Sequence, residues 1–194
     1  VTYNGTEGDW ASALQAHRSS SMQIENTTIS NNASLAISAG TNSSIYLRKS
    51  TLENNNGEYA IELQQGSVGN IEENTNISGN GIQGTRGSQI KVADGSMLNI
   101  NDSKVENGPS SGISVSWNSR LWGNRITVQN NQGNGIEANL NSLLNLSGAT
   151  ISNNGQLGIS AHDNVNIELE PNYDDVTTHN RLEGNGEGGI SLME

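Results

Sequence analysis

Three ionisable residues, Glu62, Lys91 and Glu137, each follow directly after an isoleucine that recurs along the chain. A carboxylate beside an amine could supply the two proton-transferring groups of general acid–base catalysis. The same pairing is typical of a solvated salt bridge between neighbouring strands, and we favour this simpler interpretation for Glu62 and Lys91. The three residues are therefore weak catalytic candidates, although they form the best row of ionisable groups in the chain.

A second set of candidates lies in the polar segment 170–180, which reads Glu-Pro-Asn-Tyr-Asp-Asp-Val-Thr-Thr-His-Asn. Histidine titrates near neutral pH, so His179 is a further weak catalytic candidate. Asp174 and Asp175 are weak candidates for metal ligands, and Tyr173 is a candidate ligand contact. Because a Ca²⁺ site needs several oxygens converging on one point, the sequence predicts no definite cofactor and leaves Ca²⁺ as the metal to test.

Aromatic residues offer a third kind of chemistry. An exposed indole flanked by amides suits a sugar, since the apolar face of the sugar ring packs on the indole while amides bind its hydroxyls. We predict carbohydrate contacts at Tyr46, Trp117, Arg120 and Trp122, in addition to Tyr173. The alternative interpretation is that Trp117 and Trp122 only cover each other's strand edge.

An internal repeat runs along the chain, in which a small or polar residue precedes an aliphatic anchor, and segment 170–180 is an insertion in this repeat. Successive anchors are separated by 23, 24, 29, 23, 23, 23 and 31 residues. A second apolar position follows eight residues after each of the first seven anchors, with Gly69 as its one exception, and a third apolar position comes later in each unit. The anchors are Leu14, Ile37, Ile61, Ile90, Ile113, Ile136, Ile159 and Ile190.

Each unit holds three short segments of alternating apolar residues, and each segment is followed by Asn, Gly or Ser. Alternation predicts strands and the polar clusters predict turns. Three strands per period with no helical segment between them indicate one coil of a solenoid whose coils stack in parallel. We expect a ladder of corner asparagines, which consists of Asn32, Asn55, Asn80, Asn107, Asn131, Asn154 and Asn185.

The repeat, as in Ile136-Glu137-Ala138, Leu144-Asn145-Leu146 and Thr150-Ile151-Ser152, resembles that of the pectin-lyase-like superfamily. We predict an all-β, right-handed, single-stranded parallel β-helix of about eight coils, with three strands per coil. The resemblance implies an exported protein that acts on or binds complex carbohydrate. It also implies that an enzyme of this family would carry a cluster of Asp residues, and no such cluster follows the anchors.

Two segments are expected. Residues 1–12 form an N-terminal cap or edge, and residues 13–194 form the β-helix, which we expect to continue or to dock an adjacent domain beyond its C-terminal end. Residues 9–18 fit either a capped helix or the first coil. The spacing between Leu14 and Met22 matches the repeat and favours the first coil.

Charge narrows the class of partner. With Lys+Arg 9 against Asp+Glu 20, the net charge of −11 repels nucleic acid and anionic lipid. No apolar run is long enough to span a membrane. The expected partner is a polysaccharide or cell-surface glycan, and the expected location is the exterior or surface of a bacterial cell.

Two classes of function fit this sequence. The first is a non-catalytic extracellular module, either a rigid scaffold or a carbohydrate-binding one. The second is a polysaccharide lyase, C5-epimerase or glycoside hydrolase acting on acidic polysaccharide, or a fragment of one. We favour the first, because no acid, base and metal ligands converge. Ice binding is a third, weaker hypothesis, prompted by Thr28, Thr51, Thr127 and Thr150 at equivalent outward positions.

Overall fold

The computed structural model describes residues 12–81, 87–172, 175 and 177–193. Most of the predicted N-terminal cap, residues 1–11, lies outside the described residues, as do Tyr173 and Asp174. All regular elements in the described part of the chain are strands, and they form three parallel sheets of eight, seven and seven strands.

The first sheet contains β1 (Ser12–His17), β4 (Leu35–Gly40), β7 (Ile61–Leu63), β10 (Ser88–Val92), β13 (Ser111–Val115), β16 (Ile136–Ala138), β19 (Leu157–His162) and β22 (Gly188–Met193). The second sheet contains β2 (Ser21–Glu25), β5 (Ser44–Arg48), β8 (Val68–Glu72), β11 (Met97–Asn101), β14 (Arg120–Asn124), β17 (Leu143–Ser147) and β20 (Asn166–Glu170). The third sheet contains β3 (Thr28–Ser30), β6 (Thr51–Glu53), β9 (Asn76–Ser78), β12 (Lys104–Glu106), β15 (Thr127–Gln129), β18 (Thr150–Ser152) and β21 (Arg181–Glu183).

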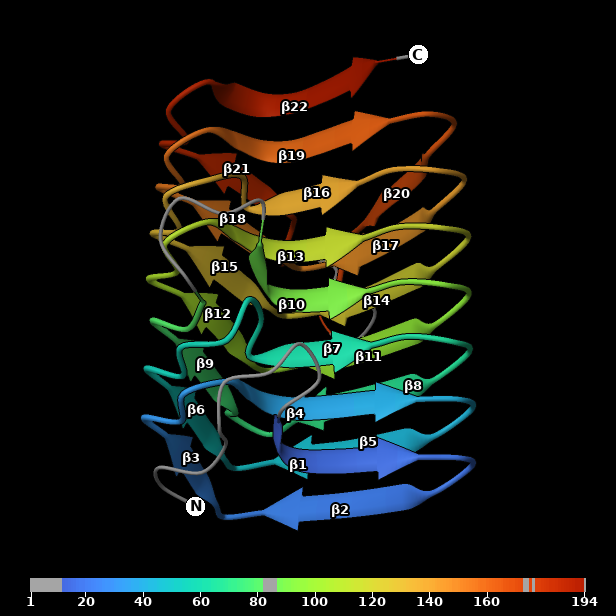
Figure 1. Ribbon diagram of the computed structural model, residues 1–194. Helices are drawn as coiled ribbons and strands as arrows, with labels where there is room; N and C mark the ends of the chain where they lie inside the picture. Colours follow the sequence, from blue (N-terminus) through green and yellow to red (C-terminus); the bar gives the residue numbers. More distant parts are fainter. Residues whose placement is uncertain (1–11, 82–86, 173–174, 176, 194) are drawn as a thin grey trace.

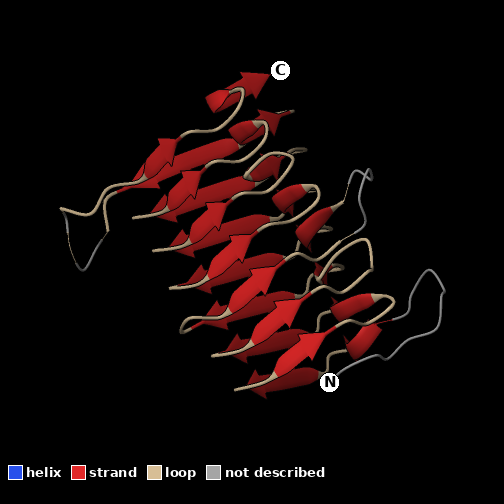
Figure 2. Ribbon diagram, turned by 90° about the vertical axis from the view of Figure 1, so that its left-hand side faces the viewer, coloured by secondary structure: helices blue, strands red, loops and turns tan. Residues whose placement is uncertain are grey.

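The chain visits the three sheets in turn, so that seven coils contribute to all three and β22 begins an eighth. Figure 1 shows the first sheet from its outer side, with β1 at the bottom of the stack and β22 at the top. Figure 2 shows the coils from the side, stacked in one direction and drawn entirely as strands and loops. The prediction of a parallel solenoid with three strands per coil is confirmed.

The core is built by the residues that the repeat predicted. Each anchor is the register partner of the next, from Leu14 with Ile37 to Ile159 with Ile190. The anchors from Ile37 to Ile159 are completely buried. The second and third apolar positions form two further inward stacks, which lie in register along the second and third sheets.

Asparagines form a buried ladder at the corner between the third and first sheets. Each side-chain amide donates to the next side-chain oxygen, with N···O distances of 2.7 Å from Asn32 to Asn55 and 3.0 Å from Asn131 to Asn154. The prediction for Asn107 is wrong. Asn107 occupies an exposed turn with φ 61°, and its amide donates to Ser78. The ladder position in that coil is held by Gly108, whose missing side chain is replaced by the amide of Gln89.

Residues 9–18 were expected to form either a capped helix or the first coil. Their described part belongs to the first coil, because Ser12–His17 is a strand that pairs with β4. The two long repeat steps correspond to the connections between β9 and β10 and between β20 and β21. At the C-terminal end of the described chain, Ile190, Leu192 and Met193 are 42%, 69% and 48% exposed. No helix in the described ranges is long and apolar enough to cross a membrane.

Candidate functional site

A hollow of about 540 Å³ lies in the outer face of the second sheet, and Trp122 forms part of its wall. Strand β14 alternates, so Leu121 is buried in the core while Arg120 and Trp122 point outward. Trp122 remains 52% exposed although it sits in the middle of a sheet. The hollow is lined by Asn70, Glu72, Asn99, Asn101, Trp122, Gly123, Asn124, Asn145 and Ser147.

Amides surround the indole because the register of the second sheet stacks them on it. Asn99 precedes Trp122 by one coil and Asn145 follows it by one. Asn99 donates to Asn70 at 2.9 Å, and Asn145 donates to Glu168 at 2.8 Å. The Oδ1 atom of Asn124 is shielded from solvent and accepts no hydrogen bond from the described residues. The hollow therefore combines an apolar ring face with polar groups that can donate and accept hydrogen bonds.

Tyr46 occupies the same outward row as Trp122 but does not line the hollow. Its hydroxyl donates a 2.8 Å hydrogen bond to Glu72, which does line the hollow. This hydrogen bond is the main reason why the pKa of Tyr46 is raised above its ordinary value. Tyr46 thus orients a carboxylate at the edge of the hollow.

Trp117 lies at the turn between β13 and β14, where its φ is 56°, and it is 57% exposed. Because Trp117 and Trp122 are both more than half exposed, neither indole is hidden by the other. Arg120 lines a separate polar hollow of about 560 Å³, which it shares with asparagines such as Asn141 and Asn164. The structure therefore places Arg120 and Trp122 side by side on β14, with Trp117 at the adjoining corner.

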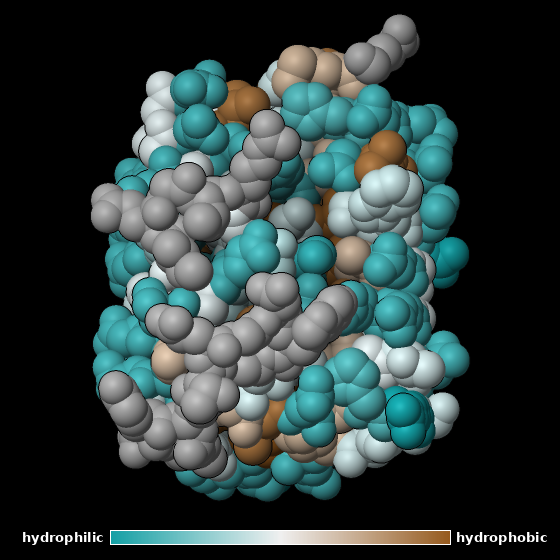
Figure 3. Space-filling view, in the orientation of Figure 1, coloured by the Kyte–Doolittle hydropathy of each residue, from teal (hydrophilic) through white to brown (hydrophobic). Residues whose placement is uncertain are grey.

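Glu62 and Lys91 are register partners in the first sheet, as the repeat predicted. Lys91 Nζ lies 3.0 Å from Glu62 Oε1 and 4.8 Å from the centroid of the Tyr59 ring. Burial is the main cause of a large rise in the Tyr59 pKa. The Glu62 side chain is only 13% exposed. The pair satisfies its own charges on the first sheet. Figure 3 shows the molecule from the side of this sheet, and the coloured residues there are mostly hydrophilic.

Glu137 does not join this pair. Ser114 separates it from Lys91 in the register of the first sheet, and its carboxylate accepts a 3.4 Å hydrogen bond from Ser111. The predicted row of ionisable groups is present as a row, but only Glu62 and Lys91 meet in it.

The connection between β20 and β21 holds Asp175 and His179. Asp175 accepts hydrogen bonds from the Thr177 and Thr178 hydroxyls at 2.6 and 2.9 Å, and these bonds lower its pKa. His179 is exposed. Throughout the described ranges, no three His, Cys, Asp or Glu side chains are arranged so that they could hold a metal ion. Roles for Tyr173 and Asp174 stay predictions, because both residues lie outside the described part.

Sequence reasoning found the row of Asn70, Asn99, Trp122 and Asn145 but not the row beside it. Glu72, Asn101, Asn124 and Ser147 also line the hollow, each two residues further along its strand. Strand alternation was the signal that could have found them, since residues two apart share a face. Alternation does not predict that Gly123, which lies between Trp122 and Asn124 on β14, also lines the hollow.

Residues 70–194 match the family described as the right handed beta helix region. Comparison with curated proteins gives no match. Among solved structures, the chain is similar to the A-module of mannuronan C-5 epimerase AlgE6 from Azotobacter vinelandii, with 12% identity and a TM-score of 0.31. This similarity covers 94% of the present chain and 58% of that chain, so the present chain spans little more than half of its length.

Proposed function

The chain belongs to the right-handed β-helix family, and from that premise we propose that it is a non-catalytic extracellular module that binds polysaccharide on its second sheet. One observation carries the proposal. The half-exposed indole of Trp122 stands in the wall of an amide-lined hollow on a rigid, parallel-stacked surface. An apolar platform beside fixed hydrogen-bonding groups is the combination that sugar rings require.

Binding is a better account of this surface than a reaction. Catalysis needs groups that are free to exchange protons with a substrate, at hydrogen-bonding distance from the reacting atoms. Glu62 and Lys91 instead neutralise each other at 3.0 Å. They also lie on the first sheet, whereas the Trp122 hollow lies on the second. The Trp122 hollow and the acid–base pair are thus on different faces of the solenoid.

The experiment compares retention of the protein in native gels that contain soluble neutral or acidic polysaccharides. We expect retention by at least one neutral polysaccharide, and Trp122→Ala is expected to weaken it by about tenfold or more. Gln23→Ala is the matched control, because Gln23 is exposed in the same outward row but outside the hollow. The Trp117→Ala variant reports separately whether the indole at the corner contributes.

Thermal melting separates lost binding from lost folding. Because Trp122 is half exposed, its replacement by alanine should leave the melting temperature nearly unchanged. Retention that Trp122→Ala does not alter would contradict the proposed site. A large loss of stability in a protein that binds no polysaccharide would show that the indole has only a structural role. Cell fractionation of the native host tests the extracellular location.

A further inference from the structure

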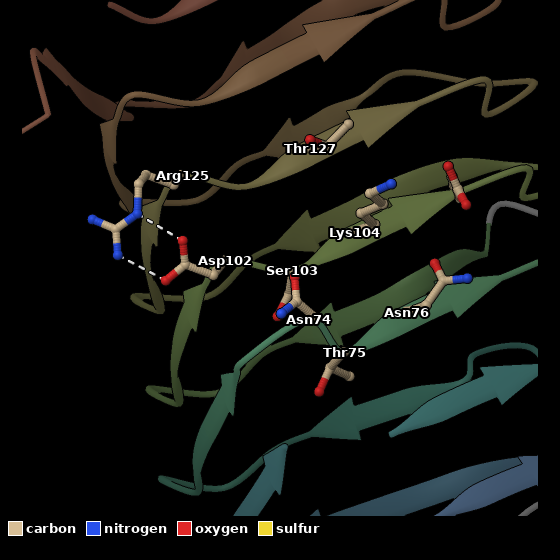
Figure 4. Close-up of a pocket in the computed structure, with 9 residues that line it drawn as sticks. Asn74, Thr75, Asn76, Asp102, Ser103, Lys104, Arg125 and Thr127 are labelled. Atoms are coloured by element: carbon tan, nitrogen blue, oxygen red, sulfur yellow. Dashed lines mark hydrogen bonds and ion pairs between the residues drawn. The ribbon is translucent and has the colours of Figure 1, made fainter. Parts of the chain in front are cut away.

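A second hollow, of about 380 Å³, lies around the corner from the Trp122 hollow, where the second sheet turns into the third. Figure 4 shows Asn76, Lys104 and Thr127 rising from three successive strands, with the Arg125–Asp102 ion pair at the corner beside them. The lining is polar throughout and consists of Asn74, Thr75, Asn76, Asp102, Ser103, Lys104, Glu106, Arg125 and Thr127.

Two polar groups of this hollow lack partners in the described part of the chain. The Oδ1 atom of Asn76 is shielded from solvent and accepts no hydrogen bond. The exposed Lys104 ammonium makes no hydrogen bond or ion pair. The nearby Glu106 is engaged by Gln129 at 2.7 Å instead. An unpaired shielded amide oxygen is costly, and the terminal torsion of asparagine is soft, so a ligand hydroxyl in the hollow can recruit this oxygen.

The two unpartnered residues also depart from the pattern of their own row. At equivalent positions in the third sheet the chain carries threonine in four coils, Thr28, Thr51, Thr127 and Thr150. Asn76, Lys104 and Arg181 interrupt this row, and of these three only Asn76 and Lys104 line the hollow. Threonine suits an exposed strand position well, so the fold alone does not call for an amide and an ammonium here.

The charges of the lining indicate the kind of ligand. Lys104 and Arg125 are balanced by Asp102 and Glu106, and Arg125 donates to both Asp102 oxygens at 2.6 and 2.7 Å. A hollow without net charge gives no preference for an ionic ligand, and the protein's net charge of −11 disfavours a polyanion. Donors and acceptors that lie together suit the hydroxyls of an uncharged sugar.

The two hollows are continuous along the chain. Asn101 and Asn124 line the Trp122 hollow, and the residues that directly follow them, Asp102 and Arg125, line the second one. Both hollows therefore draw on the same coils, and the Arg125–Asp102 pair lies at the corner between them. A ligand chain that leaves Trp122 along the direction of a coil can enter the second hollow without leaving the surface.

We propose that the hollow of Asn76, Lys104 and Thr127 is a second sugar subsite of the Trp122 site. A neutral polysaccharide then crosses the corner of the solenoid, perpendicular to its long axis, and occupies the outer faces of two sheets. This inference rests on the proposed function, and it adds the ligand class, an uncharged polymer, and the direction in which the polymer lies.

The test measures affinity against ligand length by isothermal titration calorimetry. The probes are gluco-, manno- and xylo-oligosaccharides from disaccharide to hexasaccharide. In the unaltered protein, affinity should rise from the short to the long members of the series that binds. The double variant Asn76→Thr with Lys104→Thr gives the row its usual residue and should fold normally. It should weaken binding of the hexasaccharide about tenfold while leaving the shortest binding member unchanged within about twofold.

Arg181→Thr is the matched control, since it removes a cation from the same row outside the hollow. It should leave every affinity unchanged. If long and short oligosaccharides bind equally and the double variant changes neither, the second subsite is refuted while the Trp122 site stands. If no neutral oligosaccharide binds the unaltered protein, the second subsite and its ligand class are overturned, and the native gels with acidic polysaccharides decide separately whether the Trp122 site stands. An equal loss for all lengths in the double variant would also refute the corner-crossing direction.

Discussion

Gln89 performs in one coil the hydrogen bonding that an asparagine performs in the others. Its Oε1 accepts from the backbone N–H of Asn80 at 3.1 Å, and its Nε2 donates to Asn131 Oδ1 at 2.9 Å. Gly108 makes room for it, because a Cβ at that position would lie 2.8 Å from Gln89 Cγ. The glutamine reaches from β10 into the gap that the glycine leaves, so the ladder continues without a break.

We predict that Gln89→Ala lowers the free energy of unfolding by about 2–3 kcal/mol, because the buried backbone N–H of Asn80 loses its side-chain acceptor. Asn131 Oδ1 then keeps only the hydrogen bond from the Gly108 N–H. Gly108→Asn alone should also destabilise the protein, since its side chain overlaps Gln89. The double variant should recover most of the loss by restoring the regular ladder. Urea denaturation of the unaltered protein, the two single variants and the double variant measures these free energies. Additive losses in the double variant would contradict the idea that Gln89 replaces the missing ladder asparagine.

Single residues were also where sequence reasoning met its limit. The spacing of Asn107 from its apolar residue is two rather than three, and that difference was the sign that it does not belong to the ladder. The replacement of the missing ladder asparagine by Gln89 could not be predicted, because it depends on a contact between residues from different coils. The Glu62–Lys91 pair was predictable, since both residues occupy the same position of the repeat in adjacent coils.

At the scale of the strand, neighbouring sheets compensate for each other's small residues. Gly69 is the gap in the inward row of the second sheet, and Leu63 Cδ1 would lie 2.7 Å from a Cβ placed there. In the first sheet Leu63 stands between Ala39 and Val92, which are smaller. Ile126 fills the space at Gly123 in the same way, because its Cδ1 would lie 2.8 Å from a Cβ placed on Gly123. The core keeps its density at these two positions because a large side chain faces each of the two glycines.

We predict that Leu63→Ala costs about 2–5 kcal/mol of stability, because it opens a cavity next to Gly69. Gly69→Leu alone should be strongly destabilising, since the new side chain overlaps Leu63. Combining the two substitutions should give a protein more stable than either single variant, because the rows then exchange their large and small residues. Calorimetric melting measures the effect, and a double variant less stable than both singles would refute the compensation.

Strands were the most predictable level of this structure. The anchors of the first sheet, from Leu14 to Ile190, all stack in the predicted register. The period of the repeat fixes which residues face inward, and it needs no knowledge of the partner coil. The compensation of Gly69 by Leu63 lay beyond that reasoning, because it joins two different sheets across the core. The Trp122 hollow lay beyond it for a similar reason, since its wall combines two rows and several coils.

For the whole molecule, the parallel stack separates the surfaces that carry different chemistry. Equivalent positions of adjacent coils lie about 5 Å apart, so a catalytic site must draw its groups from neighbouring coils of one face. In the described part of the first sheet, Glu62 and Lys91 are the only two ionisable residues that are register partners. Ser114 lies between Lys91 and Glu137 in the same row. Asp175 is held by two threonine hydroxyls of its own connection.

We therefore predict that the protein has no intrinsic polysaccharide-cleaving activity. A lyase or hydrolase must stabilise charge that develops in the transition state, with a metal ion or a second carboxylate beside the first group. Among the described residues, no group of His, Cys, Asp or Glu side chains could hold a metal ion beside the Glu62–Lys91 pair. The nearby Glu58 carboxylate is engaged by the Tyr59 hydroxyl at 2.9 Å. The measurement incubates the protein with pectate, alginate and neutral glucans, with and without Ca²⁺, and assays unsaturated products and reducing ends. Turnover that disappears in Lys91→Ala or His179→Ala, while Gln23→Ala keeps it, would overturn the non-catalytic assignment and make the first sheet or the β20–β21 connection the active site.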